Sequence, residues 1–194
     1  MKAALPILAL VFSTNLLAGV SPETAIKLQV QALDRPSADT VRQMGVVGAA
    51  ENQWLVQAEQ KLQWLMQRSK KLATRLQDTR LRLDLLHTIY YEAKRSGLDP
   101  GLVLAVIQVE SNFRKYAISS AGARGYMQAM PWWADIVGEP PSDLFDVKTN
   151  LRLGCAILRS YLDVEKGNVH RALARYNGSI GRSGYPNLVY AAWQ

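Results

Sequence analysis

Residues 100–112 read PGLVLAVIQVESN, and this stretch indicates the fold class. Asp99 supplies a capping carboxylate and Pro100 suits the first helical position, so a helix is predicted from Pro100 to about residue 112. Apolar helical patterns recur downstream, and they predict further helices at 131–138, 148–164 and 168–176. No long alternating strand pattern is visible. The fold is therefore predicted to be mainly α.

Glu110 falls on the apolar face of this predicted helix, together with Val103 and Ile107. Seven residues at about 100° each bring Glu110 within roughly 20° of Val103. A carboxylate there loses solvation and lies in the last turn, where the helix dipole disfavours an anion, so its pKa is predicted to rise. Such a group can still be protonated near neutral pH and can donate a proton. The alternative is a glutamate that points into water or caps a neighbouring loop.

Short segments after this helix follow one another in a characteristic order. They read ESNF at 110–113, AIS at 117–119, GARGYMQAMP at 122–131, NLRLG at 150–154 and ALARYNG at 172–178. In this order and spacing they resemble the soluble lytic transglycosylase family. The resemblance covers about residues 96–190, and it implies a lysozyme-like helical catalytic domain of the goose type over residues 97–194.

The resemblance implies that Glu110 is the single catalytic carboxylate. The substrate would be the peptidoglycan glycan strand, cut between N-acetylmuramic acid and N-acetylglucosamine. Glu110 would protonate the glycosidic oxygen and then accept a proton from the C6 hydroxyl, whose attack closes a 1,6-anhydro ring. The resemblance implies neither a metal nor a cofactor. It assigns substrate-binding roles to Ser119, Gly125, Gln128, Met130 and Tyr176.

Several of these residues have structural alternatives. Ser119 can stabilise a turn, and Tyr176, implied to lie near the glutamate and orient it, can instead be a packed core tyrosine. Trp132 and Trp133 can either stack on sugars or pack into the core. The acidic residues available as a second carboxylate lie near turns or helix starts, where capping explains them: Asp135, Glu139, Asp143 and Asp146. Two other functions stay open, a hydrolytic lysozyme on the same fold and a non-catalytic glycan-binding or envelope assembly protein.

The first half of the chain has a different organisation. Lys2, an apolar run at 3–12 and a polar end near Gly19 predict a secretory signal peptide at 1–18, with a buried N-terminal helix as the alternative. A loosely structured leader is expected at 19–50. A long helical segment with a heptad pattern is predicted at 51–96. The pattern consists of Leu55, Ala58, Leu62, Leu65, Ser69, Leu72, Leu76, Thr79, Leu83, Leu86 and Tyr90.

The heptad segment has two interpretations. It can associate with itself or with a protein partner through residues 51–90, or it can form one or two long helices laid against the catalytic domain of the same chain. Its exposed face is expected to be basic, which suits either a solvated surface or attraction to anionic envelope polymers. The basic residues are Arg68, Lys70, Lys71, Arg75, Arg80 and Arg82.

Composition excludes several classes of protein. The 194 residues are 48% apolar and 20% charged, with 23 Lys+Arg against 16 Asp+Glu, so the chain is globular and carries a formal charge of +7. A single cysteine, Cys155, excludes an intramolecular disulfide and a cysteine-cluster zinc site, and it is expected to be a buried, inert thiol. No nucleic-acid-binding motif is recognisable, and no membrane span is expected once the signal is removed. The signal and the resemblance together predict a periplasmic protein of a Gram-negative cell.

Overall fold

The computed structural model describes residues 49–193. The predicted signal peptide at 1–18 and all but two residues of the predicted leader lie outside this range. Within it the fold is mainly α, as predicted, and the only extended pairing is a pair of isolated bridges in one loop. The elements are α3 (Ala49–Leu72), α4 (Thr79–Arg95), α5 (Pro100–Ser111), α6 (Pro131–Val137), the 3-10 helix η2 (Pro141–Phe145), α7 (Val147–Val164), α8 (Val169–Tyr176) and α9 (Gly184–Trp193).

Helices α5 to α8 lie within a residue or two of their predicted bounds. Asp99 begins α5, since its side chain accepts a hydrogen bond from the backbone N–H of Leu102 at 3.0 Å. Helix α9 and the short η2 were not predicted. In the described part of the chain, no helix is both long enough and apolar enough to span a membrane.

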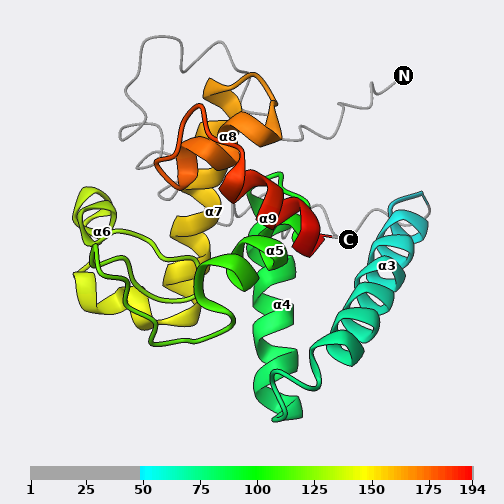
Figure 1. Ribbon diagram of the computed structural model, residues 1–194. Helices are drawn as coiled ribbons and strands as arrows, with labels where there is room; N and C mark the ends of the chain where they lie inside the picture. The colour runs from blue at the N-terminus through cyan, green and yellow to red at the C-terminus, as the bar shows by residue number, and fades with distance from the viewer. Residues whose placement is uncertain (1–48, 194) are drawn as a thin grey trace.

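The heptad segment forms two helices rather than one, because residues 73–78 separate α3 from α4 in a helical hairpin (Figure 1). This break contains neither glycine nor proline. Asp78 begins α4 by accepting hydrogen bonds from the backbone N–H groups of Arg80 and Leu81, at 2.9 and 3.1 Å. A capping carboxylate therefore starts a new helix inside a continuous heptad pattern.

Arg82 holds this break together and is not part of the exposed basic face on which it was expected. Only 7% of it is exposed. Its guanidinium donates to the side chain of Ser69 on α3 and to the backbone carbonyls of Leu76 and Gln77. An arginine has five donors in a fixed fork, so one side chain satisfies several groups of the turn.

The heptad positions do not form one buried seam. Leu72 and Leu86 are buried in the core, whereas Leu62 and Leu83 are 58% and 41% exposed. On α4 the buried face also includes Leu85 and Ile89. Helix α4 and part of α3 therefore pack against the helices that follow them in the chain.

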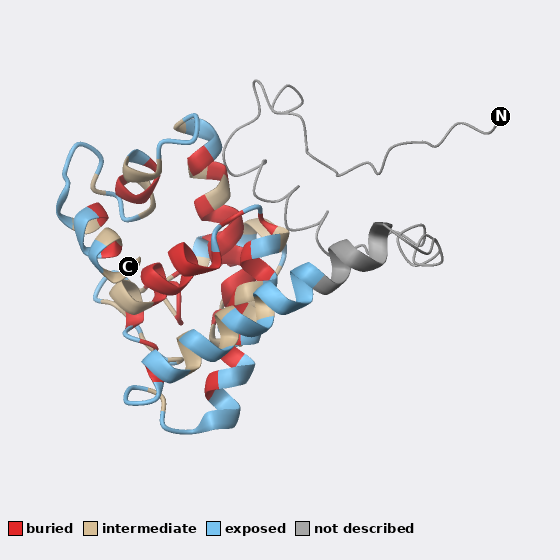
Figure 2. Ribbon diagram, turned by 90° about the vertical axis from the view of Figure 1, so that its right-hand side faces the viewer, coloured by how far each residue is buried: buried red, intermediate tan, exposed pale blue. Residues whose placement is uncertain are grey.

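Helix α5 lies at the centre of the fold, packed against α4 and α9, while α7 packs against α4 and α8. Nine of its twelve residues, the run from Pro100 to Ile107 together with Ser111, are buried, which explains its nearly continuous apolar sequence (Figure 2). Because α5 is fixed on several sides, the position of its last turn is set by the core.

Cys155 lies on α7 with no exposed surface, so the prediction of a buried thiol is confirmed. Burial raises the pKa of this thiol, and the nearby carboxylate of Glu92 raises it further. The thiolate is therefore disfavoured at physiological pH.

Candidate active site

Glu110 occupies the last turn of α5 and is partly exposed, three residues after Ile107, where the continuous buried run of that helix ends. Burial raises the pKa of Glu110 from 4.5 to about 7, against the opposing effect of a hydrogen bond from Tyr185. The pKa rise expected from the helical position is confirmed. Desolvation outweighs the hydrogen bond, so a large fraction of the group is protonated at neutral pH.

The chain reverses direction immediately after Glu110. Asn112 ends α5 in the left-handed region, with φ of 47°, and the buried Phe113 follows with φ of 64°. A bulky residue in the left-handed region is uncommon and is held by its surroundings. This turn leaves the Glu110 carboxyl at the end of the helix and starts the loop that carries the other predicted site residues.

Tyr185 donates a hydrogen bond to Oε1 of Glu110 at 2.6 Å. It lies in the first turn of α9, the helix that packs against α5. Burial raises the pKa of the Tyr185 hydroxyl well above 10, and the charge of Glu110 raises it further, so the phenol is a donor at neutral pH. No sequence pattern pointed to Tyr185, because α9 itself was not predicted and the tyrosine is 75 residues away in the chain.

Tyr176 does not make the hydrogen bond to the glutamate that its implied role suggested. Its hydroxyl donates to the backbone carbonyl of Met127 at 2.8 Å. Burial raises the pKa of the Tyr176 hydroxyl well above 10, and the charge of Glu110 raises it further. Tyr176 therefore joins the end of α8 to the loop, while Tyr185 contacts the carboxyl.

Asn150, at the start of α7, fixes the loop segment that includes Gly125. Its Oδ1 accepts from the Met127 N–H at 2.8 Å, and its Nδ2 donates to the carbonyls of Arg124 and Leu144 at 2.9 and 2.8 Å. Gly125 has φ of 75°, and a Cβ there would lie 2.4 Å from both Asn150 Nδ2 and the Leu144 carbonyl oxygen. The glycine is required because the loop backbone passes this close to α7.

Two of the predicted substrate-binding side chains make hydrogen bonds within the loop. Ser119 Oγ accepts from the backbone N–H of Ala123 at 3.1 Å, which agrees with its turn-stabilising alternative. Gln128 Nε2 donates to the carbonyls of Ala117 and Gly125, at 3.1 and 3.0 Å. Both side chains remain partly exposed. Their hydrogen bonds to the backbone help to fix the shape of the loop.

The residues around Pro131 divide between core and surface. Met130 is partly exposed and packs against a small apolar cluster that includes Trp133, whereas Met127 is fully buried. Trp133 is 5% exposed and Trp132 is 43% exposed, with ring centroids 4.1 Å apart. Trp133 is thus a core residue, and of this pair only Trp132 presents its ring to solvent.

The other carboxylates considered for catalysis have structural partners where the structure describes their contacts. Asp146 accepts from the Thr149 N–H at 2.9 Å and begins α7, which confirms its expected capping role. Glu139 forms an ion pair with Arg152 at 3.3 Å. Within residues 49–193, no group of three or more His, Cys, Asp or Glu side chains is arranged to hold a metal ion.

Comparison with known proteins gives the family. A sequence model of the transglycosylase SLT domain matches residues 87–186, just over half of the chain. The chain belongs to the transglycosylase SLT domain family. This membership agrees with the predicted lysozyme-like fold class and with the mainly helical architecture of the described residues.

Curated relatives share about a third of their sequence with this chain over the matched region. A transglycosylase of Enterobacteria phage PRD1 is 36% identical over 98 residues, which is 50% of this chain and 36% of the phage protein. Membrane-bound lytic murein transglycosylase C of Yersinia pestis (strain Pestoides F) is 34% identical over 105 residues, covering 46% of this chain and 29% of the relative. The chain thus spans about a third of the length of these relatives.

One solved structure is similar to 66% of this chain. It is lytic transglycosylase Slt from Pseudomonas aeruginosa, in an inactive mutant with glutamate replaced by glutamine. The sequence identity is 29% and the TM-score is 0.46, and the match covers 22% of that protein.

Proposed function

We propose that this chain is a peptidoglycan lytic transglycosylase in which Glu110 is the acid and then the base. The observation that carries the proposal is one partly buried carboxyl with a pKa of about 7, held by the hydroxyl of Tyr185 at 2.6 Å. The family and its named relatives support the substrate class.

In the proposed reaction, protonated Glu110 donates its proton to the glycosidic oxygen between N-acetylmuramic acid and N-acetylglucosamine. The muramyl N-acetyl group assists at the anomeric carbon as the glycosidic bond breaks. Ionised Glu110 then takes the proton of the C6 hydroxyl, whose oxygen forms a new bond to the anomeric carbon and closes the 1,6-anhydro ring. Glu110 gives one proton to the glycosidic oxygen and regains one from the C6 hydroxyl, so no proton is gained or lost overall. A single carboxyl with a pKa near neutrality suits both steps.

One carboxyl suffices in this reaction because the substrate itself supplies the second group. A glycosidase with two carboxyls uses one as acid and the other as nucleophile or base. Substrate assistance removes the need for the second group. The Glu139 ion pair and the Asp146 helix cap support this, because these two carboxylates already have structural roles.

The test is a digest of purified sacculi by the wild-type chain beside Glu110→Gln, with muropeptides analysed by mass. We expect 1,6-anhydro ends from the wild type and a loss of rate of ~10³-fold or more in the variant, since the proton donor is gone. Reducing ends would identify a hydrolytic lysozyme instead. Unchanged cleavage by Glu110→Gln would contradict the catalytic role of Glu110, and sacculus binding without cleavage by the wild type would indicate a glycan-binding protein.

Export to the periplasm is part of the same proposal, since the glycan substrate lies outside the cytoplasmic membrane. The predicted signal at 1–18 and the membership of the SLT family support it. N-terminal sequencing of the protein recovered from a periplasmic fraction tests it, with a first residue near Gly19 as the expected result.

A further inference from the structure

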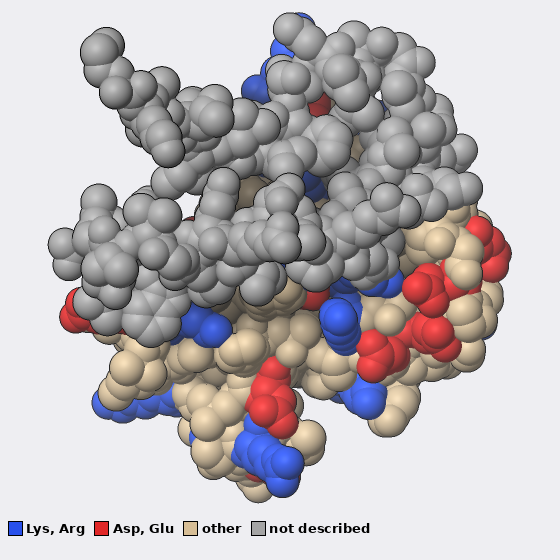
Figure 3. Space-filling view, turned by 180° about the vertical axis from the view of Figure 1, so that it is seen from behind, with Lys and Arg blue, Asp and Glu red and all other residues tan. Residues whose placement is uncertain are grey.

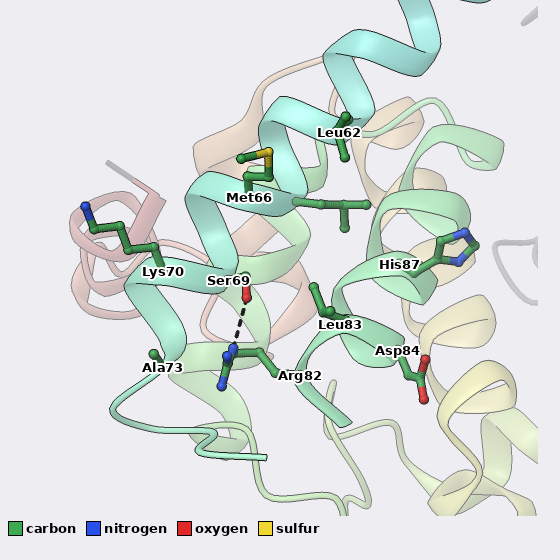
Figure 4. A pocket seen from close by; sticks show the side chains of 10 residues that line it. Leu62, Met66, Ser69, Lys70, Ala73, Arg82, Leu83, Asp84 and His87 are labelled. Carbon is green, nitrogen blue, oxygen red and sulfur yellow. Dashed lines mark hydrogen bonds between the residues drawn. The ribbon is translucent and has the colours of Figure 1, made fainter. Parts of the chain in front are cut away.

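A groove runs between α3 and α4, away from Glu110 in the chain (Figure 4). Its volume is about 680 Å³. Figure 4 shows Leu62 and Met66 on the α3 side and Leu83 on the α4 side, with the Ser69–Arg82 hydrogen bond closing one end. The complete lining is Leu62, Leu65, Met66, Ser69, Lys70, Ala73, Arg82, Leu83, Asp84 and His87.

Large apolar side chains in this groove face solvent. Leu62 is 58% exposed, Met66 65% and Leu83 41%. Exposed apolar side chains that line one groove, rather than lying singly on the surface, favour an interaction site. The rest of the hairpin does not need these side chains, because α3 contacts the core through Leu72 and, in part, through Trp64 and Leu65.

The spacing of the lining residues matches the surface that receives a helix. Residues 62, 66 and 69 on α3, with residue 73 directly after its end, follow the i, i+4, i+7, i+11 pattern of one helical face, and residues 83 and 87 on α4 are also four apart. Ridges with this spacing accept the side chains of a third helix laid between them. Leu62, Leu65 and Leu83 are members of the heptad pattern, and they line this groove. Part of the heptad pattern is therefore not buried by the fold of the chain itself.

The charge of the residues around the groove indicates which kind of helix binds there: a second copy of the chain, residues 19–48, or a helix of a partner protein. Residues 56–88 carry seven Lys or Arg and three Asp or Glu. Arg82 is bonded within the hairpin and Asp78 caps α4, which leaves six bases against Glu59 and Asp84, and Asp84 lines the groove. At the lower end of the molecule, where α3 and α4 meet, Figure 3 shows basic side chains with acidic ones beside them. A second copy would bring the same positive surface against this one. Residues 19–48 carry three acids and three bases, so they offer no charge complementarity. An acidic helix fits both the apolar and the electrostatic features.

We propose that the α3–α4 groove is the docking site for an acidic amphipathic helix of a partner protein. Apolar side chains of that helix occupy the space beside Leu62, Met66 and Leu83. Acidic side chains at its edges face cations of the hairpin such as Lys70, which lies on the rim of the groove. The proposal is independent of the reaction at Glu110, because it uses neither that residue nor its neighbours.

Binding of a designed peptide tests the groove. The probe is a fluorescein-labelled helical peptide of ~20 residues with leucines on one face and glutamates on the other. We expect saturable 1:1 binding to the full chain by fluorescence anisotropy. Leu62→Glu should weaken it at least ~10-fold by placing a charge in the apolar contact. The matched control is Leu188→Glu on α9, where the leucine is 60% exposed and outside the groove, and it should leave affinity unchanged.

A second peptide with lysines in place of the glutamates tests the charge argument. It should bind at least ~10-fold more weakly at low salt, and the difference should shrink as salt rises. Equal affinity of the two peptides would overturn the acidic character of the partner. Absence of saturable binding would overturn the docking site.

A photo-crosslinking residue at Met66 in the full chain distinguishes the three occupants by mass spectrometry. Cross-links to the acidic peptide support the proposal. Cross-links to a second copy, or to residues 19–48 of the same chain, in the presence of the peptide overturn it in favour of that occupant. Sacculus cleavage by Leu62→Glu at the wild-type rate shows that the variant is folded and that its loss of peptide binding is local.

Discussion

Glu110 is a residue whose ionised form is unfavourable for the stability of the folded protein. Its carboxyl lies at the end of a helix whose preceding residues are buried, and burial raises its pKa to about 7. A group whose pKa is higher in the folded than in the unfolded chain binds more protons when folded. Its ionised form therefore reduces the stability of the folded state as pH rises from about 4.5 through 7.

This effect predicts that Glu110→Gln stabilises the protein at alkaline pH. At pH 8 the wild-type carboxylate is ionised and poorly solvated, whereas glutamine is neutral, so the free energy of unfolding should rise by ~1–3 kcal/mol. Urea unfolding at pH 8 and at pH 4 measures it. At pH 4 the glutamate is mostly protonated in both states and the difference should nearly vanish. Equal differences at both pH values would contradict the burial of the carboxyl.

Tyr185→Phe is predicted to move the alkaline limb of the pH–rate profile to higher pH. The Tyr185 hydroxyl donates to the carboxylate and so lowers the pKa of Glu110. Without it that pKa rises further, and the proton donor persists to higher pH. The maximal rate should fall by ~2- to 10-fold because the carboxyl is less well oriented. Initial rates of sacculus solubilisation against pH measure both effects.

Tyr176→Phe is the matched control for that measurement. It removes a hydroxyl that bonds to the Met127 carbonyl and leaves the Tyr185–Glu110 bond in place. Its alkaline limb should stay near that of the wild type. A shift as large as that of Tyr185→Phe would mean that the direct hydrogen bond does not set the pKa of Glu110.

At the scale of elements, α7 determines the shape of the loop that carries Gly125 and Gln128. Asn150 binds three backbone groups, and Gly154, one turn further along, lies against the buried Met127. A buried amide that satisfies both donors and acceptors of a loop fixes its conformation more strongly than apolar contact alone. Helix α7 is therefore a support for the candidate site although it holds none of the predicted site residues.

Gly154→Ala is predicted to destabilise the protein by ~1–3 kcal/mol in spite of the better helix propensity of alanine. The new Cβ would lie 2.5 Å from Met127 Sδ and 2.7 Å from Met127 Cβ, so the loop next to Gln128 must shift. The free energy of unfolding, measured by chemical denaturation, and the rate of sacculus cleavage should both fall. Gly184→Ala is the control, since a Cβ there meets nothing within 4 Å, and a similar loss in both variants would contradict the steric explanation.

At the scale of the whole molecule, the core decides which heptad positions matter. Leu86 has no exposed surface, whereas Leu62 is 58% exposed, although both belong to the same repeat. Leu86→Ala should lower the free energy of unfolding by ~2–5 kcal/mol, and Leu62→Ala should change it by less than ~0.5 kcal/mol. Thermal and urea unfolding of the two variants measure this. Equal losses would mean that the repeat forms one continuous buried seam.

Sequence patterns predicted helices α5 to α8 well because their signals are local. Caps and prolines at Asp99, Pro100 and Pro131 set helix starts, and the apolar face of α5 carried the pKa argument for Glu110. The position of the break between α3 and α4 was not predicted, because no glycine or proline marks it. It depends on Asp78 and on Arg82, whose partners include a serine 13 residues away on another helix.

What the sequence alone determined is therefore the helical class, the family segments and the acid on an apolar helix face. Only the tertiary structure decided that Tyr185, not Tyr176, bonds to that acid, that Trp133 is buried and Trp132 exposed, and that part of the heptad repeat faces solvent. The physical reason is the distance along the chain over which each interaction acts. Helix periodicity and capping act over a few residues, whereas hydrogen-bond partners and burial depend on which distant helices pack together.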